Sequence, residues 1–388
     1  MVTLSSADNA LKSIYLGVVA NQLNTEINPL FAKIEQTTSD VWGKEIRKLA
    51  PYGINGGIGA GTEDGELPLP SQNSYAQFVL TLKNLYGTIE ISDKAIRASQ
   101  HNSGAFVDLL AAEMEGLVRA SKFNFGRMLF GDGTGTLCKV VSQTTNVLKV
   151  DTTQNLMEGM IIEVLSGATK EVVFPASRIT GIDRAGRFVI LDNKSIPSNT
   201  VSADDIVVVQ GSYKKELTGL GAIFNTNENL YGLVRTNNHW LNPTKTTVSS
   251  ITDIAIQTAI DKVEDISGVQ PDFIVCSSGV KRAYQNYLIT NRSNVDVMNL
   301  QGGYKAISYN GIPLVSDRFA PKGTMYLLNT KDFHLHQLCD WRWLEGDDGK
   351  VIKQVANKPV YTATLVKYAD MICDRPNGQA MLTGITEA

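Results

Sequence analysis

A single long helical pattern constrains this chain more than any other feature of its sequence. Large apolar residues recur at helical spacing from Phe106 to Phe130, and Asn102 or Ser103 offers an N-cap before them. Gly131-Asp132-Gly133 supplies the stop. At about 1.5 Å per residue, roughly 28 helical residues extend roughly 42 Å, which is too long for the core of a small domain. We expect a spine on which other elements pack, with its Met and aromatic stripe forming ordinary core.

Two patterns precede this helix in the sequence. A glycine-rich stretch lies between Tyr52 and Leu67, and a strand-like pattern follows that stretch from Phe78 to Ile91. No Lys-Ser or Lys-Thr pair stands at the spacing of a phosphate-binding loop, and the GxGxxG pattern is absent. We interpret the segment as a long flexible hairpin whose tip adapts its backbone to a partner. Such a hairpin exposes strand edges, which an assembling protein can use.

The first 50 residues predict an arm with helical portions. Ser5 and Asp8 form a possible capping pair, and Phe31 and Ile34 restart a helical pattern after Pro29. The arm has too few apolar residues to build its own core. It therefore packs either on a neighbouring molecule or, as an ordinary N-terminal helix, on its own domain.

Residues 136–217 have a different character, with short β-like runs separated by turns rich in Gly, Asn, Asp and Ser. The six runs are Lys139–Val141, Val147–Val150, Met160–Val164, Lys170–Phe174, Phe188–Leu191 and Ile206–Val209. This spacing predicts a small β-barrel or sandwich inserted into a larger α+β fold.

The remainder of the chain mixes helical and strand patterns. Ile251–Val263 predicts a helix, Pro271–Val275 a buried strand, and Ser277 or Ser278 the cap of a second helix. Further strands are expected at Gly311–Val315, Thr324–Leu328, His334–Leu338 and Tyr361–Ala369. The fold class is therefore α+β.

The composition argues against several classes of protein. The net charge is -3, only 19% of residues are charged, and no basic stripe for gripping phosphates is visible. If DNA is nearby, we expect this protein to enclose it without reading its sequence. The four cysteines are far apart, which argues against a disulfide framework. No signal peptide and no apolar run of about 18 residues is evident, so we expect a soluble intracellular protein without membrane contact.

Catalytic and metal-binding patterns are weak. No Gly-x-Ser-x-Gly elbow occurs, and His334 and His336 with Cys339 lack a convergent fourth ligand for zinc. Asp347-Asp348-Gly349 lacks calcium-loop spacing. His101 and His239 stand alone, and the tryptophans Trp240, Trp341 and Trp343 are expected to anchor a core or interface. We therefore predict no enzyme, no catalytic residue, no cofactor and no metal.

The order of these parts resembles the major capsid proteins of tailed bacteriophages, which have the Hong Kong or Johnson capsid fold. The resemblance depends on the arm, the glycine-rich loop and the spine helix with its Gly131–Gly135 exit, followed by Leu230–Leu233, Gln270–Val275, Tyr309–Val315 and Tyr368–Met371. Each motif alone is weak, but together they cover nearly the whole chain in order.

The resemblance implies a division of the chain into named regions. These are an N-terminal arm (1–50), an extended loop (51–92), a spine helix and peripheral domain (93–135), the inserted β domain (136–217), a return to the peripheral domain (218–247), an axial domain (248–360) and C-terminal peripheral strands (361–388).

The resemblance also implies a function and partners. Hexamers and pentamers of one chain would build an icosahedral shell around double-stranded phage DNA, assembled in the host bacterial cytoplasm. The expected subunit-contact residues of the extended loop are Gly56, Gly57, Gly59, Gly61, Glu63, Asp64, Gly65 and Glu66. Because the sequence begins almost directly in the arm, we expect a separate scaffolding protein, and a portal as a further assembly partner. No Lys–Asn pair can be matched to the covalent cross-links of some capsids, so none is predicted.

Two other functions stay open at this stage. An encapsulin-type nanocompartment shell shares the fold and would package an enzyme in place of DNA. A non-assembling β-rich binding module would leave the glycine-rich hairpin unexplained.

Overall fold

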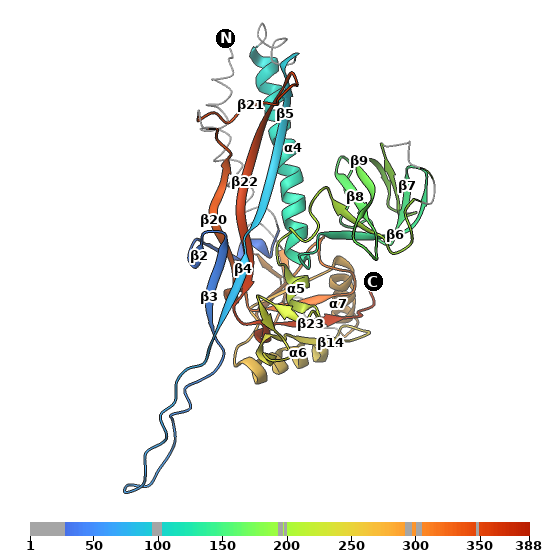
Figure 1. The fold of residues 1–388 in the computed structure, drawn as a ribbon. Coiled ribbons are helices and arrows are strands. Elements are labelled where there is room, and N and C mark those ends of the chain that lie inside the picture. The colour runs from blue at the N-terminus through green and yellow to red at the C-terminus, as the bar shows by residue number, and fades with distance from the viewer. Residues whose placement is uncertain are drawn as a thin grey trace.

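A long helix and long strands form the spine of this protein, and a β-barrel, an α/β unit and an extended hairpin are attached to it (Figure 1). The computed structural model describes residues 28–94, 103–192, 197, 200–291, 297–299, 305–346 and 349–388. None of the helices in these ranges combines the length and the apolar character that a membrane crossing needs.

The spine helix α4 (Ser103–Phe130) confirms the predicted helix, and it lies along strand β5 (Lys83–Ser92). Strand β5 alternates strictly, with Leu85, Gly87, Ile89 and Ile91 facing inward. A Cβ at Gly87 would lie 2.7 Å from the Leu117 side chain of α4, so this glycine lets helix and strand approach each other.

The spine sheet has β22 (Val360–Cys373) at its centre. Strand β22 pairs antiparallel with β5, from Val360 opposite Ser92 to Ala369 opposite Lys83. On its other edge it pairs with β20 (Phe333–Trp343), and β1 (Glu35–Thr37) adds a parallel strand beyond β20. The short β21 (Lys353–Gln354) pairs with the start of β22.

The N-terminal arm differs from its predicted structure. Residues 1–27 of the predicted arm lie outside the described residues. The expected brief helical restart at Phe31 and Ile34 is one 3-10 turn, Phe31–Lys33, and residues 35–50 contain no helix. These residues form β1, β2 (Val41–Trp42) and β3 (Glu45–Pro51), because β20 and β4 (Tyr75–Thr81) satisfy their backbone groups.

The inserted domain is a closed six-stranded barrel, which confirms the expected barrel-like fold. Its strands are β6 (Thr136–Thr144), β7 (Val147–Val150), β8 (Ile161–Leu165), β9 (Val172–Asp183), β10 (Phe188–Leu191) and β11 (Ile206–Val209). Inward-facing residues such as Leu148, Phe174 and Val189 fill its interior. Closure leaves the barrel without a free strand edge.

The α/β unit is a seven-stranded sheet with its own apolar core. Its strand order is β14 (Thr244–Thr247), β23 (Ala380–Thr383), β19 (Met325–Leu328), β15 (Phe273–Cys276), β18 (Ile312–Ser316), β17 (Lys305–Tyr309) and β16 (Val297–Asn299). Helices α6 (Asp253–Ser267) and α7 (Ser278–Thr290) pack on it, capped by Thr252 and Ser277. Two strands lie in a different sheet from most of their expected region. Strand β20 belongs to the expected axial region (248–360) but lies in the spine sheet, and β23 belongs to the C-terminal region (361–388) but lies in this seven-stranded sheet.

Short elements connect these units. They are α5 (Leu220–Phe224), β12 (Asn229–Leu230), β13 (Leu233–Val234) and the 3-10 turns His239–Leu241, Thr330–Asp332 and Pro376–Gly378.

The chain leaves for the barrel and returns from it through a tightly packed crossing, which we call the barrel root. Arg127 of α4 donates two hydrogen bonds of 2.7 Å to the Glu216 carboxylate, and both side chains are only 4% exposed. A Cβ at Gly219 would lie 2.3 Å from the carbonyl oxygen of Met128. The returning chain is thus held against the end of the spine helix by a buried ion pair and by direct backbone contact.

Asp370 of β22 ties the returning chain to the spine sheet. Its carboxylate accepts hydrogen bonds from the Thr218 amide (2.7 Å), the Thr218 hydroxyl (3.0 Å) and the Met371 amide (2.9 Å). Complete burial raises the pKa of Asp370 to about 6, although the hydrogen bonds and nearby Lys83 lower it.

Replacing Gly219 with alanine should destabilise the protein, because the new Cβ has no room against the α4 backbone. Overpacking of this kind costs roughly 1–3 kcal/mol or more, which urea unfolding would measure. Gly116→Ala is the matched control, since a Cβ there meets nothing within 4 Å and alanine favours helix. Equal stability of Gly219→Ala and the parent protein would contradict the close packing of the barrel root.

Replacing Asp370 with asparagine should change how stability depends on pH. Because folding raises this pKa from 3.8 to about 6, the folded state holds the proton more tightly. The stabilisation is present below about pH 4 and is lost as the pH rises through about 6. Asparagine can accept from both amides through Oδ1 and donate from Nδ2 to the Thr218 hydroxyl, all without a charge. At pH 8 the variant should therefore exceed the parent by on the order of 2–3 kcal/mol, with little difference at pH 4.

Urea unfolding at the two pH values would test this prediction. Asp370→Ala, which removes the hydrogen bonds as well, should be less stable at pH 4. An Asp370→Asn variant that loses the same stability at both pH values would show that the charge is not the origin of the effect.

Candidate assembly surface

The extended hairpin is the part of the described structure that projects furthest from the rest (Figure 1). Strands β3 and β4 pair from Glu45 opposite Thr81 to Pro51 opposite Tyr75. Beyond them, residues 52–74 contain no strand and form a long loop, in which Gly65 closes a turn on Thr62. The loop therefore carries few backbone hydrogen bonds of its own and can adapt to another surface.

An aromatic stack holds the base of the hairpin. The ring of Trp240 stacks on Tyr52 at 5.4 Å and on Phe78 at 5.7 Å, and Tyr231 lies 5.0 Å from Phe78. The Val79 amide also donates to the Tyr231 carbonyl, and the Cys373 amide donates to the Tyr231 hydroxyl. The base of the hairpin is thus tied to the spine sheet, while the loop beyond it stands free of the described residues.

A polar cluster supports the same base. Lys48 of β3 lies 2.7 Å from Asp374, and His334 lies 3.2 Å from the same carboxylate oxygen. His336 donates from Nδ1 to the Ser39 carbonyl, and burial lowers the pKa of His336. Although burial raises the pKa of Asp374, hydrogen bonds from His334 and Lys48 bring it below its ordinary value. Among the described residues, no group of three or more His, Cys, Asp and Glu side chains is placed to hold a metal ion.

The loop carries apolar side chains that nothing in the described structure covers. Ile54, Ile58, Leu67 and Leu69 are each at least 85% exposed. Burying one such side chain contributes about 1.5–3 kcal/mol, so covering the loop favours association. The sequence analysis did not single out these exposed residues, although the Leu67–Pro70 repeat is a signal of an extended segment, since alternating Leu and Pro stay extended.

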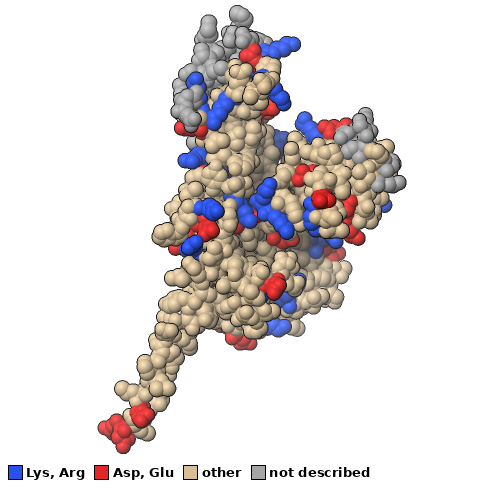
Figure 2. Space-filling view, viewed as in Figure 1, with Lys and Arg blue, Asp and Glu red and all other residues tan. Residues whose placement is uncertain are grey.

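All predicted contact residues lie on this loop, and all except half-buried Gly57 are exposed. The acidic ones, Glu63, Asp64 and Glu66, stand at its tip, which Figure 2 shows as a red end on an otherwise uncharged rod. The structure brings these residues together on one projecting element. Their contact with a neighbouring subunit remains a prediction.

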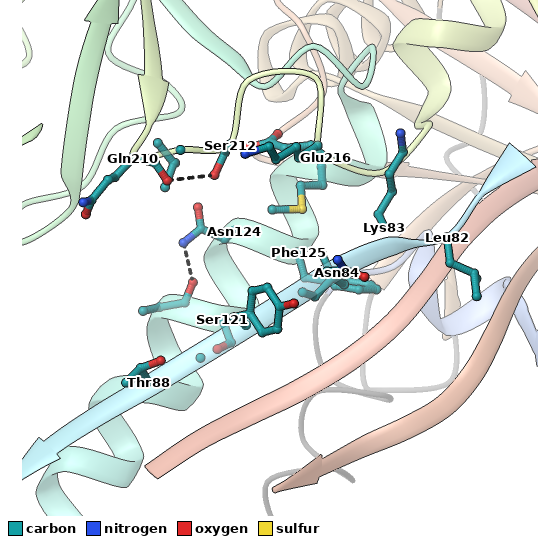
Figure 3. Close-up of a pocket in the computed structure, with 18 of the residues that line it drawn as sticks. Leu82, Lys83, Asn84, Thr88, Ser121, Asn124, Phe125, Gln210, Ser212 and Glu216 are labelled. Carbon is teal, nitrogen blue, oxygen red and sulfur yellow. Dashed lines mark hydrogen bonds between the residues drawn. The ribbon is translucent and has the colours of Figure 1, made fainter. Parts of the chain in front are cut away.

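A second surface is a cleft of about 770 Å³ between α4, β5 and the chain that returns from the barrel (Figure 3). Its apolar lining includes Leu82, Leu117, Phe125, Met128 and Trp341. Lys83, Lys214 and Lys215 also line it, and its one acidic residue is Glu216, which pairs with Arg127. The lining of the cleft therefore combines apolar side chains with three lysines.

Comparison with solved structures shows a shared fold. The chain aligns with the cyanophage A-1(L) capsid at a TM-score of 0.56, with 13% identity over 97% of this chain and 93% of the other. An encapsulin, SrpI, from Synechococcus elongatus PCC 7942 (TM-score 0.49, 9% identity, 92% and 88% coverage) and the capsid of Myoviridae phage XM1 (0.45, 9%, 92% and 92%) also align. No protein-family profile matches the chain, and no curated protein sequence does. The alignment with the cyanophage capsid shows that the chain has the tailed-phage capsid fold, as the resemblance implied.

Replacing Trp240 with alanine should loosen the hairpin at its base. Two aromatic contacts would be lost, worth about 1–3 kcal/mol together. Amide hydrogen exchange in β3 and β4 should accelerate roughly ten- to hundredfold, while the barrel strands stay unchanged. Trp42→Ala, at a position 70% exposed, is the control and should leave exchange in β3 and β4 nearly unaltered. Unchanged exchange in Trp240→Ala would mean that the stack does not hold the hairpin.

Proposed function

We propose that this chain is a major capsid protein that assembles as hexamers and pentamers into an icosahedral shell around phage double-stranded DNA. The capsid fold extends over 97% of the chain, and this observation carries the proposal. The role is structural, with the protein located in the virion after assembly in the host bacterial cytoplasm.

The exposed hairpin supports assembly on independent physical grounds. A monomer gains nothing from holding Ile54, Ile58, Leu67 and Leu69 in water on a projecting rod. A neighbouring copy that covers them removes this apolar surface from water and supplies partners for the free backbone groups of the loop. Gly56, Gly57, Gly59, Gly61 and Gly65 then let the loop adjust to the slightly different angles of hexamers and pentamers.

The regions keep their proposed roles with two refinements from the strand pairing. The seven-stranded unit with α6 and α7 is the proposed axial domain, and it includes β23 from the C-terminal segment. The spine helix and spine sheet form the proposed peripheral domain, and they include β20. The barrel remains a proposed insertion within the peripheral domain, between the spine helix and the segment 218–247 that returns to that domain.

The proposed partners follow from charge and from the assembly role. With a net charge of -3 and no basic stripe in its sequence, the protein would enclose DNA without gripping particular bases. A separate scaffolding protein and a portal are the proposed partners during assembly. No covalent cross-link and no cofactor is part of the proposal.

Electron microscopy after size-exclusion chromatography tests this function, with the recombinant protein alone and with a candidate scaffold. We expect closed icosahedral particles, or rings of five and six subunits. Particles filled with an enzyme in place of DNA, when isolated from the native source, would favour a nanocompartment shell. A persistent monomer of 42.2 kDa under every condition would overturn the proposal and favour a binding module.

A further inference from the structure

We propose that Asn55 in the extended hairpin is a site of spontaneous chemical modification, at which the backbone nitrogen of Gly56 displaces the side-chain nitrogen as ammonia and aspartate or isoaspartate results. The sequence contains three Asn-Gly pairs, at 55–56, 310–311 and 377–378. Such pairs are reactive because glycine has no Cβ to shield its backbone nitrogen. The structure separates the first pair from the other two, and the chemistry does not depend on the proposed shell function.

The reaction is a ring closure within two residues. The Gly56 nitrogen gives its proton to a hydroxide ion and forms a bond to Cγ of Asn55. The bond from Cγ to Nδ2 then breaks, and Nδ2 takes a proton from water and leaves as ammonia, which restores the hydroxide. Water opens the resulting succinimide ring at either carbonyl carbon and gives aspartate or isoaspartate. In isoaspartate the main chain runs through the former side chain and is longer by one methylene.

A hydrogen bond already folds the Asn55 side chain toward the reacting nitrogen. The Gly57 amide donates to Asn55 Oδ1 at 2.8 Å, so the bond closes across the Gly56 peptide. Negative charge develops on Oδ1 when the nitrogen attacks Cγ, and a backbone N–H at this distance stabilises such a charge. A Cβ on residue 57 would lie 3.0 Å from Oδ1, so the contact favours glycine there. The three residues thus supply the carbon, the attacking nitrogen and the stabilising donor.

The attacking nitrogen is also accessible. Among the described residues, the Gly56 amide donates no hydrogen bond. Residues 54–56 are exposed, and the projecting loop from 52 to 74 contains no strand that would hold its backbone (Figure 1). Water and hydroxide therefore reach this peptide, and ring closure can change its backbone angles without breaking a strand pairing.

The pair at 310–311 is held in a tight turn between β17 and β18. Asn310 and Gly311 both have positive φ angles, of 48° and 81°. The Gly311 amide donates to the Ser308 hydroxyl at 3.2 Å. The Asn310 side-chain amide donates to Gln257 of α6 at 3.3 Å. The nitrogen and the side chain are therefore both engaged, and ring closure would have to break the turn.

The pair at 377–378 lies in the 3-10 turn Pro376–Gly378, close to α6. Gly378 is buried, and its amide donates to the Arg375 carbonyl at 3.0 Å. A Cβ at this position would lie 3.2 Å from the Val269 side chain, so the surroundings are tightly packed. Because hydroxide has little access to this nitrogen, we expect Asn377 to stay an amide.

Modification changes the chemistry of the hairpin. The loop from 52 to 74 carries Glu63, Asp64 and Glu66 and no Lys or Arg. A carboxylate at position 55 adds a further negative charge to this loop, and isoaspartate also lengthens its backbone. Because the reaction needs time and hydroxide, a sample of identical chains becomes a mixture as it ages.

Ageing of the purified full-length protein, followed by peptide mass spectrometry, tests the proposal. At mildly alkaline pH, Asn55 should gain the mass difference between amide and acid at least about tenfold faster than Asn310 and Asn377. The rate should rise in proportion to hydroxide concentration. Chromatography should separate two products of equal mass, aspartate and isoaspartate, because the ring opens at either carbonyl carbon.

Glycine substitutions test the geometry. Gly56→Ala places a methyl group beside the attacking nitrogen, and Gly57→Ala crowds Oδ1 and displaces its donor, so each should slow the reaction roughly tenfold. A Cβ at position 56 meets only Ser71, at 3.5 Å or beyond, so Gly56→Ala should fold like the parent. Gly61→Ala is the matched control in the same loop, because a Cβ there lies 3.8 Å from the Glu66 carbonyl, and it should leave the rate unaltered.

The outcomes are distinct. Equal rates at the three asparagines would overturn the choice of Asn55. Aspartate without isoaspartate would overturn the ring closure, because direct hydrolysis of the side chain gives aspartate alone. A Gly57→Ala variant that reacts as fast as the parent would overturn the role of the Gly57 amide. None of these results bears on the shell function, which is tested by particle assembly.

Discussion

The fold depends on the pairing of β22 with β5, which joins the last part of the chain to residues 83–92. This ladder sets the length of the spine sheet, and α4 packs against β5 along it. The other edge of β22 pairs with β20, and β1 pairs with β20 in turn, so this sheet joins segments that are far apart in the sequence. Contacts between segments so far apart in the sequence carry a large entropic cost of loop closure, and this cost slows their formation.

A buried lysine of this sheet depends on polar partners from neighbouring strands. Lys367 of β22 is fully buried, with Nζ 2.9 Å from Gln36 and 3.1 Å from Asp340, and over the Trp341 ring at 5.7 Å. Burial lowers the pKa of Lys367, although Asp340 raises it. Because a buried charge without partners is strongly destabilising, this lysine couples β22 to β20 and to the first strand.

The barrel and the hairpin are two solutions to the same problem of free strand edges. The barrel closes on itself and presents no edge. The hairpin contains no strand over residues 52–74 and places apolar side chains between glycines and prolines there. The barrel therefore satisfies its own strand edges, whereas the hairpin is held only at its base, by Trp240 and Lys48.

Local sequence patterns determined much of this structure. The helices α4, α6 and α7, the six barrel strands and the buried strands around β15 follow from periodicity, caps and turn residues, which act over a few residues. The resemblance to the capsid fold depended on the order of these parts. The glycine-rich loop and its acidic residues were also evident in the sequence.

Tertiary structure decided what local patterns could not. Residues 35–50 became strands because β20 and β4 offered them partners. Strands β20 and β23 each joined a different sheet from the strand that precedes them in the sequence, β19 and β22 respectively. The cleft joins Lys83 to Lys214 and Lys215, which are far apart in the chain and adjacent only because the barrel root brings its two crossing segments against β5. The sequence by itself therefore determined the elements and the projecting loop, whereas only long-range pairing and burial decided which surfaces those elements create together.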